Sequence, residues 1–125
     1  MDEKTFTTTI KSASWEMTKR ERVKFSDNRG SIKLDEVVTG DGIELNVVDY
    51  VELAIHNGYS KDRQDYANYV LICDDGTTYV TGSPSFWSAF KPIYDELEGE
   101  DVTIKVVKKA SKNYTGKSFL SCYLI

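Results

Sequence analysis

Residues 43–81 read IELNVVDYVELAIHNGYSKDRQDYANYVLICDDGTTYVT, and this stretch decides the fold. Its first part, Ile43–Ile55, is a long run rich in Val, Ile, Leu and Tyr, which is typical of a β-strand. A second run, Tyr66–Cys73, is followed by Asp75-Gly76, the residue pair of a tight hairpin turn, and then by Thr77–Thr81. The stretch therefore predicts three consecutive strands.

A helix is predicted directly after the third strand. Ser83 is a suitable N-cap, and Pro84 suits the first helical position. The apolar residues that follow recur at helical spacing and form one face: Phe86, Phe90, Ile93, Tyr94 and Leu97. We expect Pro92 to kink this helix or divide it in two, and Gly99 to end it.

A second hairpin is predicted at the C-terminal end, with strands at Val102–Val107 and Phe119–Ile125 and a turn over Lys108–Lys117. The order from residue 43 onward is then three strands, a helix and two strands, which is the order of the OB barrel. We expect a mainly β, OB-fold-like barrel of five core strands with one helix between strands 3 and 4. The 125 residues fit a single domain, with residues 43–125 as the barrel.

The first 42 residues form an N-terminal extension with weaker patterns. A strand is expected at Phe6–Ile10, whereas Lys19–Phe25 fits either a short strand or the end of a helix. Ile32–Val38 is ambiguous, and turn signals stand on either side of it at Asp27–Gly30 and Gly40–Gly42. Trp15 has no predicted place.

The sequence lacks the features of exported and membrane proteins. Met1–Thr5 carries no apolar run, and no segment approaches the roughly 18 apolar residues of a membrane span. Cys73 and Cys122 lie in apolar strand-like runs, as buried free thiols do in a reducing compartment. A disulfide between neighbouring strands is the alternative. We expect a cytoplasmic protein.

Catalytic patterns are missing from the sequence. The single histidine, His56, stands beside Asn57-Gly58 at a strand end, where histidine more often stabilises a turn than acts as a base. One His and two separated Cys do not have zinc spacing, and no phosphate-binding loop or nucleophile elbow occurs. We expect neither an enzyme nor a bound cofactor or metal.

Charge is distributed unevenly along the chain. The net charge is −4, yet residues 102–125 contain five lysines and no acidic residue. A basic segment on an acidic body is typical of a localised binding surface for a polyanion. Chance clustering on a solvated hairpin is the alternative.

The candidate binding residues follow from the predicted barrel. OB barrels bind oligonucleotides on the face of strands 2 and 3 and with the loops joining strands 1–2 and 4–5. Both loops, here 57–65 and 108–117, contain a tyrosine flanked by basic residues, and rings stack on bases while lysines follow phosphates. Alternation in the last strand turns Leu120, Cys122 and Leu124 inward and two aromatic residues outward. The candidates are Tyr59, Lys61, Arg63, Tyr69, Tyr79, Lys105, Lys108, Lys109, Lys112, Tyr114, Lys117, Phe119 and Tyr123.

Structural alternatives exist for several of these residues. The segment 1–30 is the alternative cover for Phe119 and Tyr123, and Tyr69 with Tyr79 fits an ordinary cross-strand pair as well as a stacking pair. Trp87 lies beside the apolar helix stripe and is expected in the core. Lysines and tyrosines on loops contact backbones and ring faces, so we expect binding without sequence readout.

Three segments resemble the small OB-fold single-stranded-DNA-binding proteins of tailed bacteriophages: Asp75–Ser83, Phe86–Phe90 and Ser111–Lys117. The similarity covers residues 43–125. It implies sequence-independent binding that protects replication or recombination intermediates, in the cytoplasm of the host. It also implies a binding role for Lys108, Lys109, Lys112, Tyr114 and Lys117. Cellular relatives often end in an acidic tail that recruits partners, whereas this sequence ends within a strand, so such recruitment is not expected.

Single-stranded DNA is thus the expected partner, with RNA, a second copy of the chain and phage replication or recombination proteins left open. The competing hypothesis is a protein-interaction or virion-associated structural domain whose basic hairpin docks on an acidic partner.

Overall fold

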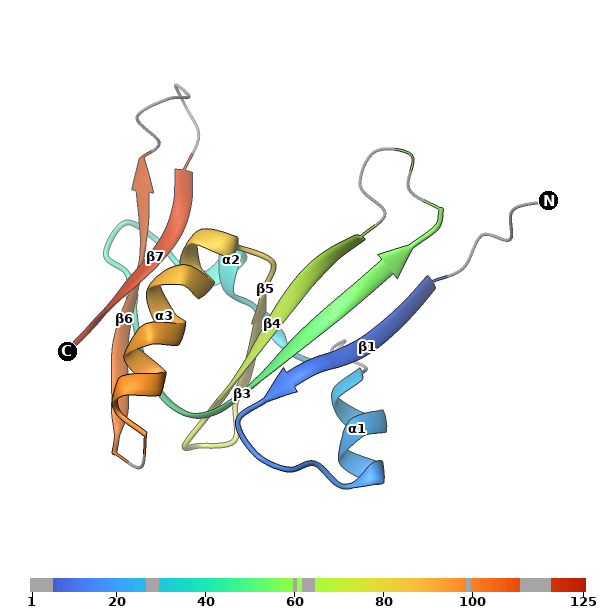
Figure 1. The fold of residues 1–125 in the computed structure, drawn as a ribbon. Coiled ribbons are helices and arrows are strands. Elements are labelled where there is room, and N and C mark those ends of the chain that lie inside the picture. Colours follow the sequence, from blue (N-terminus) through green and yellow to red (C-terminus); the bar gives the residue numbers. More distant parts are fainter. Residues whose placement is uncertain (1–5, 27–29, 60, 62–64, 99, 111–117) are drawn as a thin grey trace.

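The computed structural model describes residues 6–26, 30–59, 61, 65–98, 100–110 and 118–125. In this part of the chain seven strands and three helices form (Figure 1). They are β1 (Phe6–Ala13), α1 (Lys19–Ser26), β2 (Ile32–Lys33), α2 (Leu34–Val37), β3 (Ile43–Asn57), β4 (Asp65–Cys73), β5 (Thr78–Thr81), α3 (Pro84–Glu96), β6 (Val102–Ala110) and β7 (Ser118–Leu124). The fold is mainly β, as predicted, but its strongly curled half-barrel sheet has seven strands in place of five.

The sheet has the topology of a Greek key. Its strand order is β2-β5-β4-β3-β6-β7, and β1 pairs with β3. β3, β4 and β5 are consecutive antiparallel strands, and β6 returns through α3 to pair with β3. The resulting order β6-β3-β4-β5 is that of a Greek key. No pairing joins β5 to β7 among the described strands, which leaves the barrel open on that side.

β3 is the central strand of the sheet and pairs with three other strands. β4 pairs along one edge of β3, while the other edge pairs first with β6 and then with β1. A register shift interrupts the β3–β4 ladder between Val47 and Asp49. Because an extra residue resets the alternation of side chains, Val47 and Tyr50 belong to one hydrophobic core, whereas Val51 and Leu53 belong to another.

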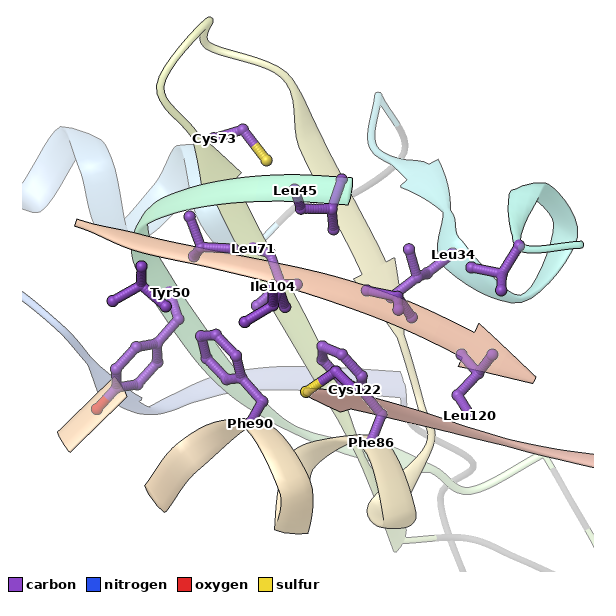
Figure 2. Close-up of a cluster of buried hydrophobic side chains, with 14 residues drawn as sticks. Leu34, Leu45, Tyr50, Leu71, Cys73, Phe86, Phe90, Ile104, Leu120 and Cys122 are labelled. Carbon is purple, nitrogen blue, oxygen red and sulfur yellow. The ribbon is translucent and has the colours of Figure 1, made fainter. Parts of the chain in front are cut away.

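The first core fills the inside of the curled sheet (Figure 2). Phe86 and Phe90 of α3 are fully buried, with ring centroids 5.7 Å apart. They pack against strand residues that include Leu71, Ile104 and Leu120. Each fully buried side chain of this size contributes about 1.5–3 kcal/mol, so this core is a main source of stability.

The helix α3 starts as predicted. Ser83 Oγ accepts a hydrogen bond from the Phe86 N–H at 3.2 Å, and Pro84 occupies the first turn. The prediction that Pro92 divides the helix is wrong, since α3 continues to Glu96 and the proline lies on its exposed side. The predicted stop at Gly99 falls outside the described residues.

A second core lies on the opposite face of the sheet and uses the N-terminal residues. Buried side chains of β3, β4 and β5 form its base, namely Val51, Leu53, Ile55, Val70 and Val80. Side chains that precede β2 pack over them, among them Ile10, Trp15 and Phe25. The N-terminal residues are therefore part of the folded domain, and they cover the outer face of β3, β4 and β5.

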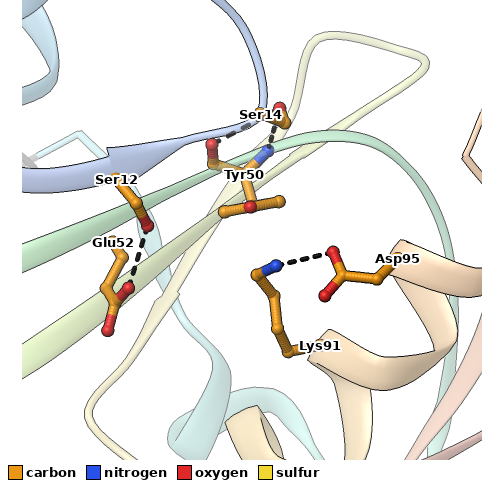
Figure 3. A network of polar contacts seen from close by, with 6 residues as sticks. All are labelled: Ser12, Ser14, Tyr50, Glu52, Lys91 and Asp95. Atoms are coloured by element: carbon orange, nitrogen blue, oxygen red, sulfur yellow. Dashed lines mark hydrogen bonds and ion pairs between the residues drawn. The ribbon is translucent and has the colours of Figure 1, made fainter.

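Hydrogen bonds also fix the N-terminal residues to β3 (Figure 3). Ser14 Oγ donates to Asp49 Oδ1 at 2.7 Å. It also accepts the Tyr50 N–H at 3.0 Å. Ser12 Oγ donates to Glu52 Oε1 at 2.9 Å. These contacts join β1 and the residues after it to the centre of the sheet.

The structure resolves the ambiguous N-terminal predictions. Lys19–Phe25 lies in the helix α1, β1 is longer than predicted, and Ile32–Val38 divides into β2 and α2. The predicted turn at residues 40–42 is confirmed, because the Gly42 N–H donates to Thr39 O at 2.9 Å. Gly42 has φ +75°, and a Cβ there would lie 2.8 Å from Val106 O, so glycine is required.

The second predicted turn is also present. Gly76 has φ +86°, and its N–H donates to Cys73 O at 3.0 Å in the tight link between β4 and β5. Cys73 and Cys122 are both buried and unbridged, as predicted. Burial raises the pKa of both thiols to about 11. In the described part of the chain, no helix is long and apolar enough to cross a membrane.

Candidate nucleic-acid interface

The outer face of the β6–β7 hairpin carries lysines and aromatic rings in register. Because side chains alternate, Val106 and Cys122 point into the first core while their neighbours point outward. Lys105 pairs directly with Tyr123, and Lys109 pairs with Phe119. Side chains at directly opposite positions have Cβ atoms about 4.5–5.5 Å apart. We call Lys105, Lys109, Phe119 and Tyr123 the lysine–aromatic strip.

Both rings of the strip are open to solvent. Phe119 is 40% exposed and Tyr123 is 51% exposed. The alternative in which segment 1–30 covers them is wrong for the described residues, because these pack over β3, β4 and β5 instead. Leu124, expected in the core, is 46% exposed at the end of β7.

The predicted site on the face of strands 2 and 3 is not open. Those strands correspond to β4 and β5, whose outer face lies under Trp15, Met17 and Phe25 in the second core. A strand of nucleic acid has no access to that face in this structure.

Two tyrosine candidates lie inside the molecule. Tyr69 is 7% exposed, and its ring stacks on Trp87 with centroids 4.4 Å apart and planes 9° apart. Tyr79 is half-buried against the first core, and this burial raises its pKa. Tyr69 pairs with Thr81 and Tyr79 pairs with Leu71, so they are not directly opposite each other. We leave both out of the candidate interface. Trp87 packs with the first core, as predicted.

Lys108 lies on the other face of the hairpin from the strip. It pairs with the buried Leu120 and lines an open cavity of about 410 Å³ together with Asp35, Ser85 and the strip residue Phe119, which borders both surfaces. The lysines near the C-terminal end are therefore divided between two surfaces.

The tip of the β3–β4 hairpin carries two further candidates. Tyr59 is 64% exposed and Lys61 is exposed. The Tyr59 N–H donates to Asn57 Oδ1 at 3.0 Å, and His56 Nδ1 lies 2.7 Å from Asp65 Oδ1 across the strand ends. His56 thus stabilises the hairpin. In Figure 1 the β3–β4 and β6–β7 hairpins extend toward the same side of the molecule and diverge.

The remaining candidates, Arg63, Lys112, Tyr114 and Lys117, lie outside the described residues. Among the residues that are described, no three His, Cys, Asp or Glu side chains gather as a metal site would require.

One basic surface was missed by the sequence analysis. The helix α1 exposes Lys19, Arg20, Arg22 and Lys24. The signal was the motif Thr18-x-x-Glu21, which is a helix-capping box and would have predicted a helix start at this place.

Comparisons of the chain with protein-family models, with curated proteins and with solved structures found no match.

Proposed function

We propose that this chain binds single-stranded DNA without regard to sequence, through the lysine–aromatic strip of β6 and β7. The observation that supports this most is the register of the strip, in which each exposed ring stands directly opposite a lysine. An exposed ring can stack on an unpaired base, which contributes about 1–3 kcal/mol per base, while the neighbouring ammonium group contacts the phosphate. Tyr59 and Lys61 at the β3–β4 tip would extend the contact.

The topology supports an OB-like barrel as the scaffold for this role. An OB-fold is a partly open Greek-key barrel of five strands. Here β3, β4, β5, β6 and β7 would be those five strands, with α3 between the third and fourth. β1, α1 and the residues between them would be additions that close the outer face of β4 and β5, whereas β2 pairs with β5 and α2 packs Leu34 into the first core.

The proposal includes the biological setting that the sequence resemblance implies. The protein would coat single strands during phage replication or recombination, in the cytoplasm of the host, without cofactor or catalysis. The net charge of −4 would limit binding to duplex DNA away from the strip.

The first experiment separates base stacking from charge attraction. Fluorescence anisotropy is measured with a labelled oligo(dT) and with an abasic strand of the same length, over a range of salt concentrations. The natural chain should prefer oligo(dT) by about tenfold or more, because an abasic strand offers no ring to stack on. The double variant Phe119→Leu/Tyr123→Leu should lose this preference while keeping an apolar surface.

The second experiment tests the lysines of the strip. Lys105→Gln/Lys109→Gln should lower the slope of log K against log salt by about 1.4, since each phosphate contact contributes about 0.7 for single strands. The matched control is Lys11→Gln/Lys33→Gln, which removes the same charge from ammonium groups that pair with Glu52 at 3.6 Å and Glu36 at 4.0 Å. The control should keep the natural slope.

A specific observation favours a second candidate function. Leu124 and Ile125 are 46% and 59% exposed at the end of β7, and exposed apolar side chains there also suit a protein partner with acidic residues at its rim. If the natural chain binds neither strand at low salt, the DNA-binding proposal is refuted and protein docking at this surface is favoured.

A further inference from the structure

The helix α1 presents positive charge to the solvent on the sides that Phe25 does not turn toward the second core. It is eight residues long and contains no buried residue. Its cationic side chains are all exposed, and we call them the basic helix face: Lys19, Arg20, Arg22 and Lys24. A helix this short is marginal in water by itself, so its place in the structure depends on its contacts with the rest of the chain.

The only acidic residue of α1 is engaged mainly in hydrogen bonds that cap the helix. Glu21 Oε1 accepts the Thr18 N–H at 3.0 Å, and the Glu21 N–H donates to Thr18 Oγ1 at 3.2 Å, which completes a capping box. Its other oxygen accepts the indole N–H of Trp15 at 3.1 Å. These bonds, with the Thr18 N–H first, lower the pKa of Glu21, and the charge of Lys24 lowers it to a smaller extent. Glu21 therefore anchors the helix to the second core.

The anchoring also fixes which way the helix faces. The ring of Trp15 meets the ring of Phe25 edge to face, with centroids 5.4 Å apart. Phe25 packs on the second core, so the side of α1 that carries it is turned toward the sheet. The cations then occupy the remaining sides, where a large ligand can reach them.

Several charges on this face oppose the helix, although Lys24 stands in the last turn, where the dipole favours a cation, with its Nζ 5.5 Å from the centroid of the Phe25 ring. Lys19 and Arg22 are three residues apart, and Arg20 and Lys24 are four apart, spacings at which like charges repel across a helical turn. Lys19 and Arg20 also stand in the first turn, where the helix dipole disfavours cations. No described carboxylate forms an ion pair with any of the four. A bound polyanion would remove this repulsion.

We infer that the basic helix face binds phosphate groups of nucleic acid, as a second contact surface beside the lysine–aromatic strip. The inference rests on the proposed function, because the same strand would reach both surfaces. Figure 1 shows α1 next to β1, away from the β6–β7 hairpin, so only a longer strand spans the two. The helix exposes no aromatic ring, so it contacts phosphates and leaves the bases to the strip.

A lipid surface is a poorer match for this helix. Val23, which is 75% exposed, is the single exposed apolar side chain on α1. Helices that lie in a membrane interface bury a broad apolar face in addition to their charges.

The test compares two double variants that lose equal charge. Arg20→Gln/Lys24→Gln removes two cations from the basic helix face, and Lys11→Gln/Lys33→Gln serves as the control. Anisotropy is measured with labelled oligo(dT) of about 8 and about 30 nucleotides, lengths chosen around the site sizes of such folds. On the long strand the helix variant should lower the salt slope by about 1.4 relative to the control. On the short strand the two variants should bind equally.

Thermal unfolding gives the second measurement. The helix variant loses like-charge repulsion together with the Lys24 contact over the Phe25 ring, and the control loses two ion pairs, so the two melting temperatures should be close. A clear fall in melting temperature would assign these residues a structural role and overturn the inference.

The outcomes distinguish the two proposals. Equal salt slopes for both variants on the long strand would overturn the inference and leave the strip untouched. A natural chain that shows no preference for oligo(dT) over an abasic strand would refute base stacking on the strip. If the helix variant then loses affinity for inorganic polyphosphate and the control does not, phosphate binding by the helix is supported. Binding to vesicles of anionic lipid, with none to either nucleic acid, would overturn both.

Discussion

Trp15→Ala is the sharpest test of whether the N-terminal residues belong to the folded domain. Trp15 packs on the second core, and its ring meets Phe25 at 5.4 Å. Truncating a fully buried tryptophan to alanine costs about 3–5 kcal/mol, and half-burial reduces this to about 2 kcal/mol. Loss of the edge-to-face contact adds about 1 kcal/mol. The free energy of unfolding should therefore fall by about 3 kcal/mol.

The assay is urea unfolding at neutral pH, with thermal unfolding beside it. For a chain of this length the melting temperature should fall by about 12 °C. Val23→Ala is the control on α1, because Val23 is 75% exposed and its truncation should change stability by less than about 0.5 kcal/mol. Equal stability of Trp15→Ala and the natural chain would refute the second core and make the N-terminal residues an appended arm.

Two further predictions concern the turns and the thiols. Gly42→Ala should destabilise the chain by about 2 kcal/mol and Gly76→Ala by about 1 kcal/mol. Both positions need positive φ, but only at Gly42 would the new methyl group collide with a neighbour, Val106 O. Equal urea midpoints for the two variants would contradict this prediction. Since burial raises the pKa of Cys73 and Cys122 to about 11, above the ordinary value of 9.0, their contribution to stability is present below pH 9 and is lost as the pH rises toward 11. Thiol reagents at pH 8 should label these cysteines slowly in the native chain and rapidly in urea, and rapid native labelling would show that the thiols are accessible.

The C-terminal two-thirds of the fold was predictable because its signals are local. Asp75-Gly76 specifies its own turn, and Ser83-Pro84 specifies its own helix start, whatever the rest of the chain does. The N-terminal residues carry fewer such signals, chiefly the capping box at Thr18 and the turn signal at Gly40–Gly42. Trp15 and Phe25 find their place only against Val51 and Val70, and contacts between residues so distant in sequence leave no local pattern.

The candidate site was predicted where strand alternation applied and missed where the strand boundary was wrong. Phe119 and Tyr123 face outward beside Lys105 because alternation in a strand fixes the side of each residue. The predicted strand ended at Val107, which put Lys108 in a loop. β6 instead continues to Ala110, so alternation turns Lys108 to the inner face.

The position of β3 between the two hydrophobic clusters has a consequence for how the molecule comes apart. Val47 and Tyr50 contribute to one cluster and Val51 and Leu53 to the other, although they are neighbours in the same strand. Both clusters use side chains of the paired strands β3 and β4, so separation of these two strands would disrupt both clusters. The chain should therefore unfold in one cooperative transition although it has two hydrophobic clusters, and a destabilising substitution in either cluster should lower the stability of both.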